Sequence, residues 1–238
     1  MIDFAEIIVD KSMRLIALGL AANRLKTVVS GLEHIPAHGP ALIVARHYHH
    51  LFDGLVLFAA IRRRFHIVVT LDWAQNTPTK YFFATINHLA RWPTLLRGDA
   101  LNRAGGGRRK LFSQRDVNRY RRRAMRQSVN LLLEGRVLVI FPEGYPNIDP
   151  AYTPKTKPDE FLPFKPGFLS ILRAAEKRRK QKIPIIPAGL SYSQGSPWSG
   201  YLQFGSPVYR DSSLSSEEMI RKLEQAVKSL SAVNRAQF

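Results

Sequence analysis

The sequence contains no cysteine, which excludes disulfide bonds, thiolate metal sites and a cysteine nucleophile. It also lacks an uncharged apolar run of about 18 residues, the length that a membrane-spanning helix needs. Acidic residues are scarce, because 18 Asp and Glu stand against 36 Lys and Arg and leave a net charge of +18. This charge favours an anionic partner. It does not choose between nucleic acid, an anionic membrane surface and an acidic carrier protein.

Four short apolar runs have the length of strands, at residues 41–45, 66–70, 137–141 and 183–190. Each run is nearly continuous, as expected for strands that are covered on both faces. Helix-like segments lie between or after them, at residues 55–62, 80–90, 117–134 and 168–180. This alternation predicts a single α/β domain with a mostly parallel or mixed central sheet flanked by helices. A further strand at 202–204 and a final helix opened by the capping box of Ser215 and Glu218 complete the prediction.

The N-terminal segment has the pattern of an amphipathic helix. Residues 12–29 are apolar with cationic flanks, which fits a helix that lies in a membrane interface. The alternative is a helix packed on the core of the domain. We expect residues 1–27 to form this helix and residues 28–238 to form the main domain.

The stretch RHYHHLFDG, residues 46–54, places three histidines and one aspartate directly after the first predicted strand. Histidine can take up a proton near neutral pH, and a neighbouring carboxylate can orient it and stabilise its charged form. The pattern H-E-x-x-H is absent, so we expect no metal ion here.

A second motif, FPEG at residues 141–144, also follows an apolar run. Ligands of open α/β sheets bind outside the carboxyl ends of the strands, and both motifs are predicted to lie at that edge. Together they point to acyl transfer. A long proline-rich segment, residues 147–166, follows FPEG and is expected to form a surface loop that lines the site.

The order of these motifs resembles the glycerophospholipid acyltransferases of the 1-acylglycerol-3-phosphate acyltransferase type. That family has a strand ending in N-H-x-x-x-x-D, an internal arginine-bearing motif, a strand ending in F-P-E-G-T-R-S and a late V-P-V-x-P strand. The corresponding stretches here are ALIVARHYHHLFDG, GDALNR, VLVIFPEGYPN and IPIIPAGLSY. The resemblance extends from about residue 28 to the C-terminus.

The first motif departs from the family in its spacing. The family places four residues between His and Asp, whereas this chain has five between His47 and Asp53 and three between His49 and Asp53. Position after the strand favours His47 as the catalytic base. Helical spacing favours His49, since residues i and i+4 share a face.

The second departure follows FPEG, where the family has Thr-Arg and this chain has Tyr145 and Pro146. A bidentate partner for the acceptor phosphate is therefore lost. The resemblance leaves Arg103, in the internal motif, and Arg97 as candidates for binding the substrate. It also implies that Glu143 and Gly144 shape the acceptor site.

The resemblance implies an enzyme of phospholipid biosynthesis that moves a fatty acyl group to a hydroxyl of a lysophospholipid or a related lipid. The donor would be the thioester of acyl-CoA or of acyl carrier protein, with no cofactor, and backbone N–H groups would stabilise the oxyanion. We expect a cytoplasmic protein bound peripherally to the anionic inner face of the cell membrane. Two alternatives are a basic nucleic-acid-binding protein, which would leave both motifs unexplained, and a catalytically inactive lipid-binding relative.

Overall fold

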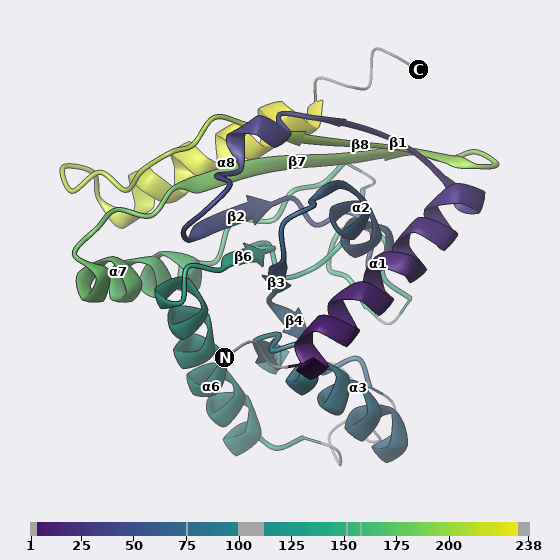
Figure 1. Ribbon diagram of the computed structural model, residues 1–238, viewed down its shortest axis with the longest axis horizontal. Helices are drawn as coiled ribbons and strands as arrows, with labels where there is room; N and C mark the ends of the chain where they lie inside the picture. Colours follow the sequence, from purple (N-terminus) through teal and green to yellow (C-terminus); the bar gives the residue numbers. More distant parts are fainter. Residues whose placement is uncertain (1–3, 75, 100–111, 151, 158, 233–238) are drawn as a thin grey trace.

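A computed structural model describes residues 4–74, 76–99, 112–150, 152–157 and 159–232. Its centre is a six-stranded sheet with the strand order β1-β8-β7-β2-β6-β3 (Figure 1). The strands are β1 (Leu25–Ser30), β2 (Ala41–Ala45), β3 (Phe65–Ile67), β6 (Val137–Ile140), β7 (Ile185–Ser193) and β8 (Trp198–Phe204). Neighbouring strands are parallel except β7 and β8, which are antiparallel. The predicted α/β fold with a mixed sheet is therefore confirmed.

Helices cover both faces of this sheet. The described residues form α1 (Phe4–Arg24), the short 3-10 helix η1 (Leu32–His34), α2 (Phe52–Ala60), α3 (Thr77–Leu89), α6 (Gln114–Leu133), α7 (Gly167–Arg179) and α8 (Ser216–Ala232). Along β2, Ile43 belongs to the core cluster that includes α2, whereas Leu42 and Val44 belong to the cluster that includes α6, α7 and α8. Every side chain of β2 is buried, which explains why its sequence is continuously apolar.

The last helix begins and packs as its sequence indicates. The predicted capping box is present, because Ser215 N–H donates to Glu218 Oε2 at 2.8 Å and Glu218 N–H donates to Ser215 Oγ at 3.2 Å. Glycine at position 189 of β7 lets α8 approach closely. A Cβ atom there would lie 2.4 Å from the carbonyl carbon of Leu230.

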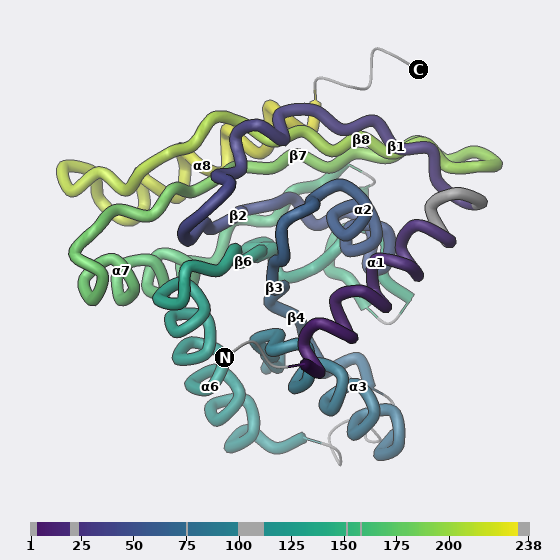
Figure 2. The backbone as a smooth tube through the Cα atoms, in the orientation of Figure 1, coloured from purple at the N-terminus to yellow at the C-terminus, as the bar shows by residue number. Residues whose placement is uncertain are grey.

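The N-terminal helix ends earlier than its apolar pattern suggests. It stops at Arg24, and Leu25–Ser30 forms β1, which pairs in parallel with β8 from Leu25 opposite Trp198 to Ser30 opposite Gln203. The sequence LKTVVS alternates between more and less buried positions and carries β-branched residues, which suits an edge strand. Figure 2 shows the chain passing from α1 directly into this strand.

Helix α1 is nevertheless docked on the domain. Arg14 donates from Nη1 to the carbonyl oxygens of Phe58 and Ile61, at the C-terminal end of α2, at 3.1 and 2.5 Å. A guanidinium group is favourable there because the last carbonyls of a helix lack intrahelical partners.

The predicted strand at 66–70 is divided between two sheets. Strand β3 pairs with β6, while β4 (Val69–Thr70) pairs with β5 (Thr94–Leu95) in a separate two-stranded sheet. The change of partner occurs at Val68, whose N–H still donates to Val139 O, whereas Val69 N–H donates to Pro93 O.

Candidate active site

The loop after β2 brings one histidine against the aspartate. His47 Nδ1 lies 2.8 Å from Asp53 Oδ2, which is hydrogen-bonding distance. Asp53 is 1% exposed, whereas the His47 side chain is 18% exposed. The His47 ring also stacks on Phe141, with 4.4 Å between the ring centroids. The arrangement fixes one ring nitrogen on a buried carboxylate and leaves the imidazole open to solvent.

The Asp53 carboxylate accepts several hydrogen bonds from its own loop. It accepts the backbone N–H of Tyr48 at 2.7 Å and of His49 at 3.1 Å, in addition to its contact with His47. Tyr192 of β7 lies close by, and burial together with the Asp53 carboxylate raises the pKa of the Tyr192 hydroxyl. Three contacts of this kind hold the carboxylate in one orientation toward the His47 ring.

His49 has a different environment. Its Nδ1 accepts the backbone N–H groups of Leu51 and Phe52, both at 3.2 Å, and its ring stacks on Phe52 with 4.1 Å between the centroids. Burial lowers the pKa of His49 to about 4, an effect strengthened by His50 and opposed by Asp53. The side chain thus accepts two backbone N–H groups that have no partner within the helix at the start of α2.

The backbone donors of this loop are already engaged. Each N–H from position 47 to position 53 has an acceptor within the protein: Glu143 Oε1 for His47, Asp53 for Tyr48 and His49, Ile148 O for His50, His49 Nδ1 for Leu51 and Phe52, and His49 O for Asp53. None of these backbone N–H groups is therefore free to donate to an oxyanion. An oxyanion donor has to come from another segment.

The FPEG motif contains two of the predicted site residues, Glu143 and Gly144. Glu143 is fully buried, and its carboxylate accepts His47 N–H at 2.9 Å and Leu162 N–H at 3.0 Å. Gly144 has a φ of +77°, a left-handed conformation that favours glycine. A Cβ atom at this position would also lie 3.1 Å from Lys165 Nζ.

Arg97 is held beside the FPEG turn by a buried ion pair. Its Nε and Nη2 lie 2.9 and 2.8 Å from Asp72 Oδ2, and its Nη1 donates to Gly144 O at 3.0 Å. The guanidinium also covers the ring of Tyr145, with its central carbon 4.2 Å from the ring centroid. Arg97 therefore links Asp72 to the FPEG turn. Arg103, the other predicted substrate ligand, lies outside the described residues.

Sequence analysis missed Lys155, whose side chain is fully buried and lies 2.6 Å from Glu143 Oε2. The proline-rich loop that carries it has no hydrophobic period, and its partners lie far away in the sequence, so no local signal marks it. It missed Tyr192 as well, because β7 continues to Ser193 and Tyr192 lies beyond the predicted run at 183–190. Within the ranges that the structure covers, no group of three or more histidine and acidic side chains could hold a metal ion.

Comparisons with known proteins agree with this architecture. A family model described as Acyltransferase matches residues 26–191. Among solved structures, the chain is similar to the 1-acyl-sn-glycerophosphate (LPA) acyltransferase PlsC from Thermotoga maritima, with a TM-score of 0.60 and 18% sequence identity. That match covers 97% of this chain and 80% of the other. No curated protein matches the sequence significantly.

Proposed function

Since this chain belongs to the acyltransferase family, we propose that it transfers a fatty acyl group from a thioester to a hydroxyl of a lysophospholipid or related lipid, in phospholipid biosynthesis. The observation that carries the proposal is the contact of 2.8 Å between His47 Nδ1 and the buried Asp53 carboxylate. A general base needs one nitrogen held and the other able to reach the substrate, and His47 meets this condition.

In this mechanism His47 Nε2 removes the proton of the acceptor hydroxyl while the oxygen attacks the thioester carbonyl. Asp53 stabilises the imidazolium ion that forms. When the carbon–sulfur bond breaks, the imidazolium returns the proton to the departing thiolate, so an ester and a free thiol are the products. His49 is the weaker candidate for the base because its Nδ1 is engaged by the first turn of α2.

The donor is proposed to be acyl-CoA or acyl carrier protein, both of which are anionic. Helix α6 supports this assignment because it exposes a series of arginines: Arg115, Arg119, Arg121, Arg122, Arg123 and Arg126. Within the same helix the acidic counterpart is Asp116, which pairs with Arg119 at 2.6 Å. An excess of positive charge on one helix attracts anionic substrates over long range.

The acceptor is proposed to differ from lysophosphatidic acid. Tyr145 and Pro146 stand where the family has Thr-Arg, and Arg97 is committed to Asp72 and to the FPEG turn. We therefore expect lysophosphatidic acid to be a poor acceptor unless Arg103 compensates. Competition between lysophosphatidic acid and an uncharged hydroxylated lipid, in the wild type and in Arg103→Ala, tests this. A preference for lysophosphatidic acid that survives Arg103→Ala would contradict both assignments.

The protein is further proposed to act as a peripheral protein on the anionic inner face of the cell membrane. Among the described residues, no helix has the length and apolarity to cross a bilayer. Instead, α1 exposes large apolar side chains to solvent, at Phe4, Ile8, Leu15, Ile16 and Leu18. Exposed apolar residues on a helix that is otherwise docked suit insertion into a membrane interface.

The two alternatives from the sequence are less well supported. The irregular spacing of the first motif favoured an inactive relative, yet His47 and Asp53 lie at hydrogen-bonding distance despite it. A nucleic-acid-binding role accounts for the charge but gives no reason for a buried carboxylate aimed at a partly exposed histidine.

The direct test is to incubate the purified protein with radiolabelled palmitoyl-CoA or palmitoyl carrier protein and a total bacterial lipid extract. Label is expected in a lipid ester, and the amount should depend on the protein. Hydrolysis to free fatty acid without a labelled lipid ester would replace the proposed transferase with a thioesterase.

A further inference from the structure

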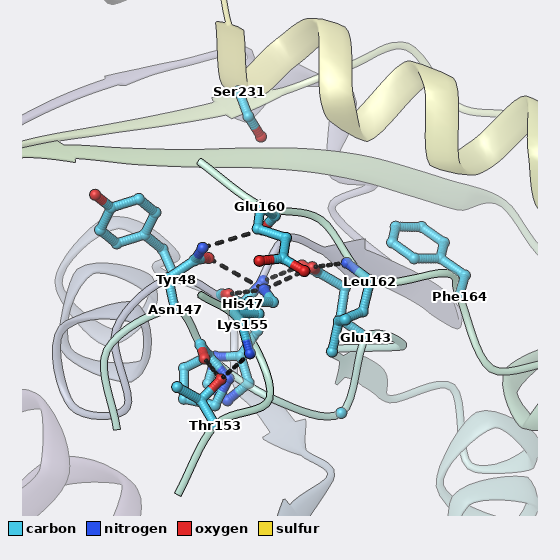
Figure 3. A network of polar contacts seen from close by, with 12 residues as sticks. His47, Tyr48, Glu143, Asn147, Thr153, Lys155, Glu160, Leu162, Phe164 and Ser231 are labelled. Carbon is cyan, nitrogen blue, oxygen red and sulfur yellow. Dashed lines mark hydrogen bonds and ion pairs between the residues drawn. The ribbon is translucent and has the colours of Figure 1, made fainter. Parts of the chain in front are cut away.

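The loop between β6 and α7 carries a buried lysine, Lys155, that contacts residues of the active site. Lys155 Nζ donates to His47 O at 2.9 Å and to Asn147 Oδ1 at 3.1 Å, and it lies 2.6 Å from Glu143 Oε2 (Figure 3). These three contacts use all three N–H bonds of the ammonium group. The side chains of Lys155 and Glu143 are both 0% exposed.

The ion pair of Lys155 and Glu143 binds both backbone polar groups of His47. Glu143 Oε1 accepts the His47 N–H at 2.9 Å, while Lys155 holds the His47 carbonyl oxygen. Because the N–H and the C=O of His47 are held from opposite sides of its Cα, the backbone torsions that aim its imidazole are constrained. The ion pair therefore fixes the direction in which the His47 side chain leaves the backbone, while Asp53 and Phe141 hold the ring itself.

Stability alone is a weak explanation for this pair. Removing two charges from water costs several kcal/mol per ion, and buried pairs often add little net stability. Burial lowers the pKa of the Lys155 ammonium group, against the opposing effect of Glu143, which reflects this desolvation. A pair that costs this much and holds the backbone of the histidine is better explained by orientation.

The loop around Lys155 is built to hold it in place. Asn147, which accepts from Lys155, donates from Nδ2 to the carbonyl oxygens of Lys157 and Glu160 at 3.2 and 3.0 Å. Ile148 also exchanges backbone hydrogen bonds with the histidine loop, donating to Tyr48 O at 2.8 Å. The lysine is thus fixed relative to the residues that it contacts.

We propose that Lys155 is a positioning residue for acyl transfer, which acts with Glu143 on the backbone of His47 so that the imidazole stays aligned between Asp53 and the acceptor. Lys155 does not reach the substrate, because its side chain is fully buried, and it acts through His47. The inference rests on the proposed function, in which His47 is the base.

The test compares Lys155→Met with Lys157→Met, which replaces an exposed lysine of the same loop. Lys155→Met is expected to lower kcat by about a hundredfold with KM within about threefold, as misalignment of a catalytic group does. Lys157→Met should match the wild type. In a His47→Ala background, Lys155→Met should have no further effect on the residual rate. A further loss of the residual rate would show that Lys155 acts on the site in general, and would overturn the proposal.

A second variant covers the case in which Lys155→Met does not fold. Glu143→Gln combined with Lys155→Met removes both charges together, so no uncompensated buried charge remains. It should fold and still lose turnover about a hundredfold. Wild-type turnover in the folded double variant would contradict the proposal.

A spectroscopic measurement separates this inference from the proposed function. Proton NMR of the wild type should show a downfield Nδ1–H signal from His47 on Asp53, identified by its absence in His47→Ala. The signal should shift or broaden in Lys155→Met and persist in Lys157→Met, whether or not the protein turns over a thioester. An unchanged signal in Lys155→Met would overturn the positioning role, whereas the absence of wild-type turnover would overturn only the proposed function.

Discussion

Among the described residues, two histidines lie beside a buried carboxylate, and the exposure of the imidazole differs between the two pairs. His47 lies 2.8 Å from Asp53 and is partly exposed. His66 of β3 lies 3.6 Å from Glu6 of α1, and both of these side chains are almost completely buried, at 1% and 2% exposure. A buried carboxylate beside a histidine therefore does not identify an active site. The access of the imidazole to solvent makes the distinction.

The His66 pair belongs to a cluster that docks α1. Glu6 lies 3.5 Å from Arg64 and 3.6 Å from Arg91, so its charge is balanced by ion pairs without aligned hydrogen bonds. His66 Nδ1 lies 3.1 Å from Ala90 O, and burial lowers the pKa of His66 even though Glu6 opposes the effect. Both ring nitrogens face the interior, so His66 has no route to a substrate.

The largest effect should follow from Asp53→Asn. The amide cannot stabilise an imidazolium ion, so kcat should fall by roughly a hundredfold to ten-thousandfold. Thioester turnover and the melting temperature should be measured on the same preparation. Turnover within tenfold of the wild type would place the essential carboxylate elsewhere.

Glu6→Gln should give the opposite result, a loss of stability without loss of activity. It leaves the charges of Arg64 and Arg91 without their buried partner, and we expect the free energy of unfolding to fall by about 1 to 3 kcal/mol. Both arginines are partly exposed, so solvent limits the cost. Urea unfolding and turnover of the folded variant measure the two quantities. A large loss of kcat in fully folded Glu6→Gln would break the distinction between the pairs.

The free energy of unfolding should fall at low pH because of His49. His49 has a pKa of about 4 in the folded protein and about 6.5 when unfolded, so between these values only the unfolded state binds the proton. Its contribution is present above pH 6.5 and is lost as the pH falls towards 4, by up to about 1.4 kcal/mol per pH unit.

His49→Asn should reduce this loss, since the Asn oxygen can still accept the N–H groups at the start of α2. His38→Asn, which replaces an exposed histidine outside this loop, serves as the control. Urea unfolding at pH 7 and pH 5 supplies the comparison. An equal loss of stability in the wild type and in His49→Asn would remove His49 from this explanation.

The smallest effect concerns the membrane. Leu15 and Leu18 are 71% and 55% exposed, so Leu15→Gln with Leu18→Gln should leave folding intact. We expect sedimentation with anionic vesicles to weaken by roughly tenfold, and added salt to weaken it further. Tyr209→Gln alters an exposed side chain outside α1 and should bind like the wild type. Equal binding by the Leu15 and Leu18 variant would remove α1 from the membrane contact.

The fold was predictable because its central strands are buried on both faces and leave continuous apolar runs in the sequence. Strand β1 was missed because LKTVVS directly continues an apolar helix, and its partner β8 lies far along the chain. Long-range pairing of this kind leaves no local pattern.

The location of the candidate site at the edge of the sheet was predictable, but the histidine that contacts Asp53 was not. The motifs after β2 and β6 meet as expected, because the carboxyl ends of parallel strands share one edge. Spacing alone left two histidines open, since the turn that directs His49 onto the start of α2 is a property of the folded loop. Lys155 was not predictable for the same reason. Its role depends on contacts across 108 positions of sequence to His47.

The most direct test of the account compares His47→Asn with His49→Asn in an assay of thiol release from acyl-CoA that depends on a lipid acceptor. His47→Asn should lower kcat by roughly a hundredfold or more with a melting temperature close to that of the wild type. His49→Asn should stay within about fivefold of the wild type, because Asn preserves the acceptor that His49 provides. Turnover that survives His47→Asn and is lost in His49→Asn would contradict the assignment of the base.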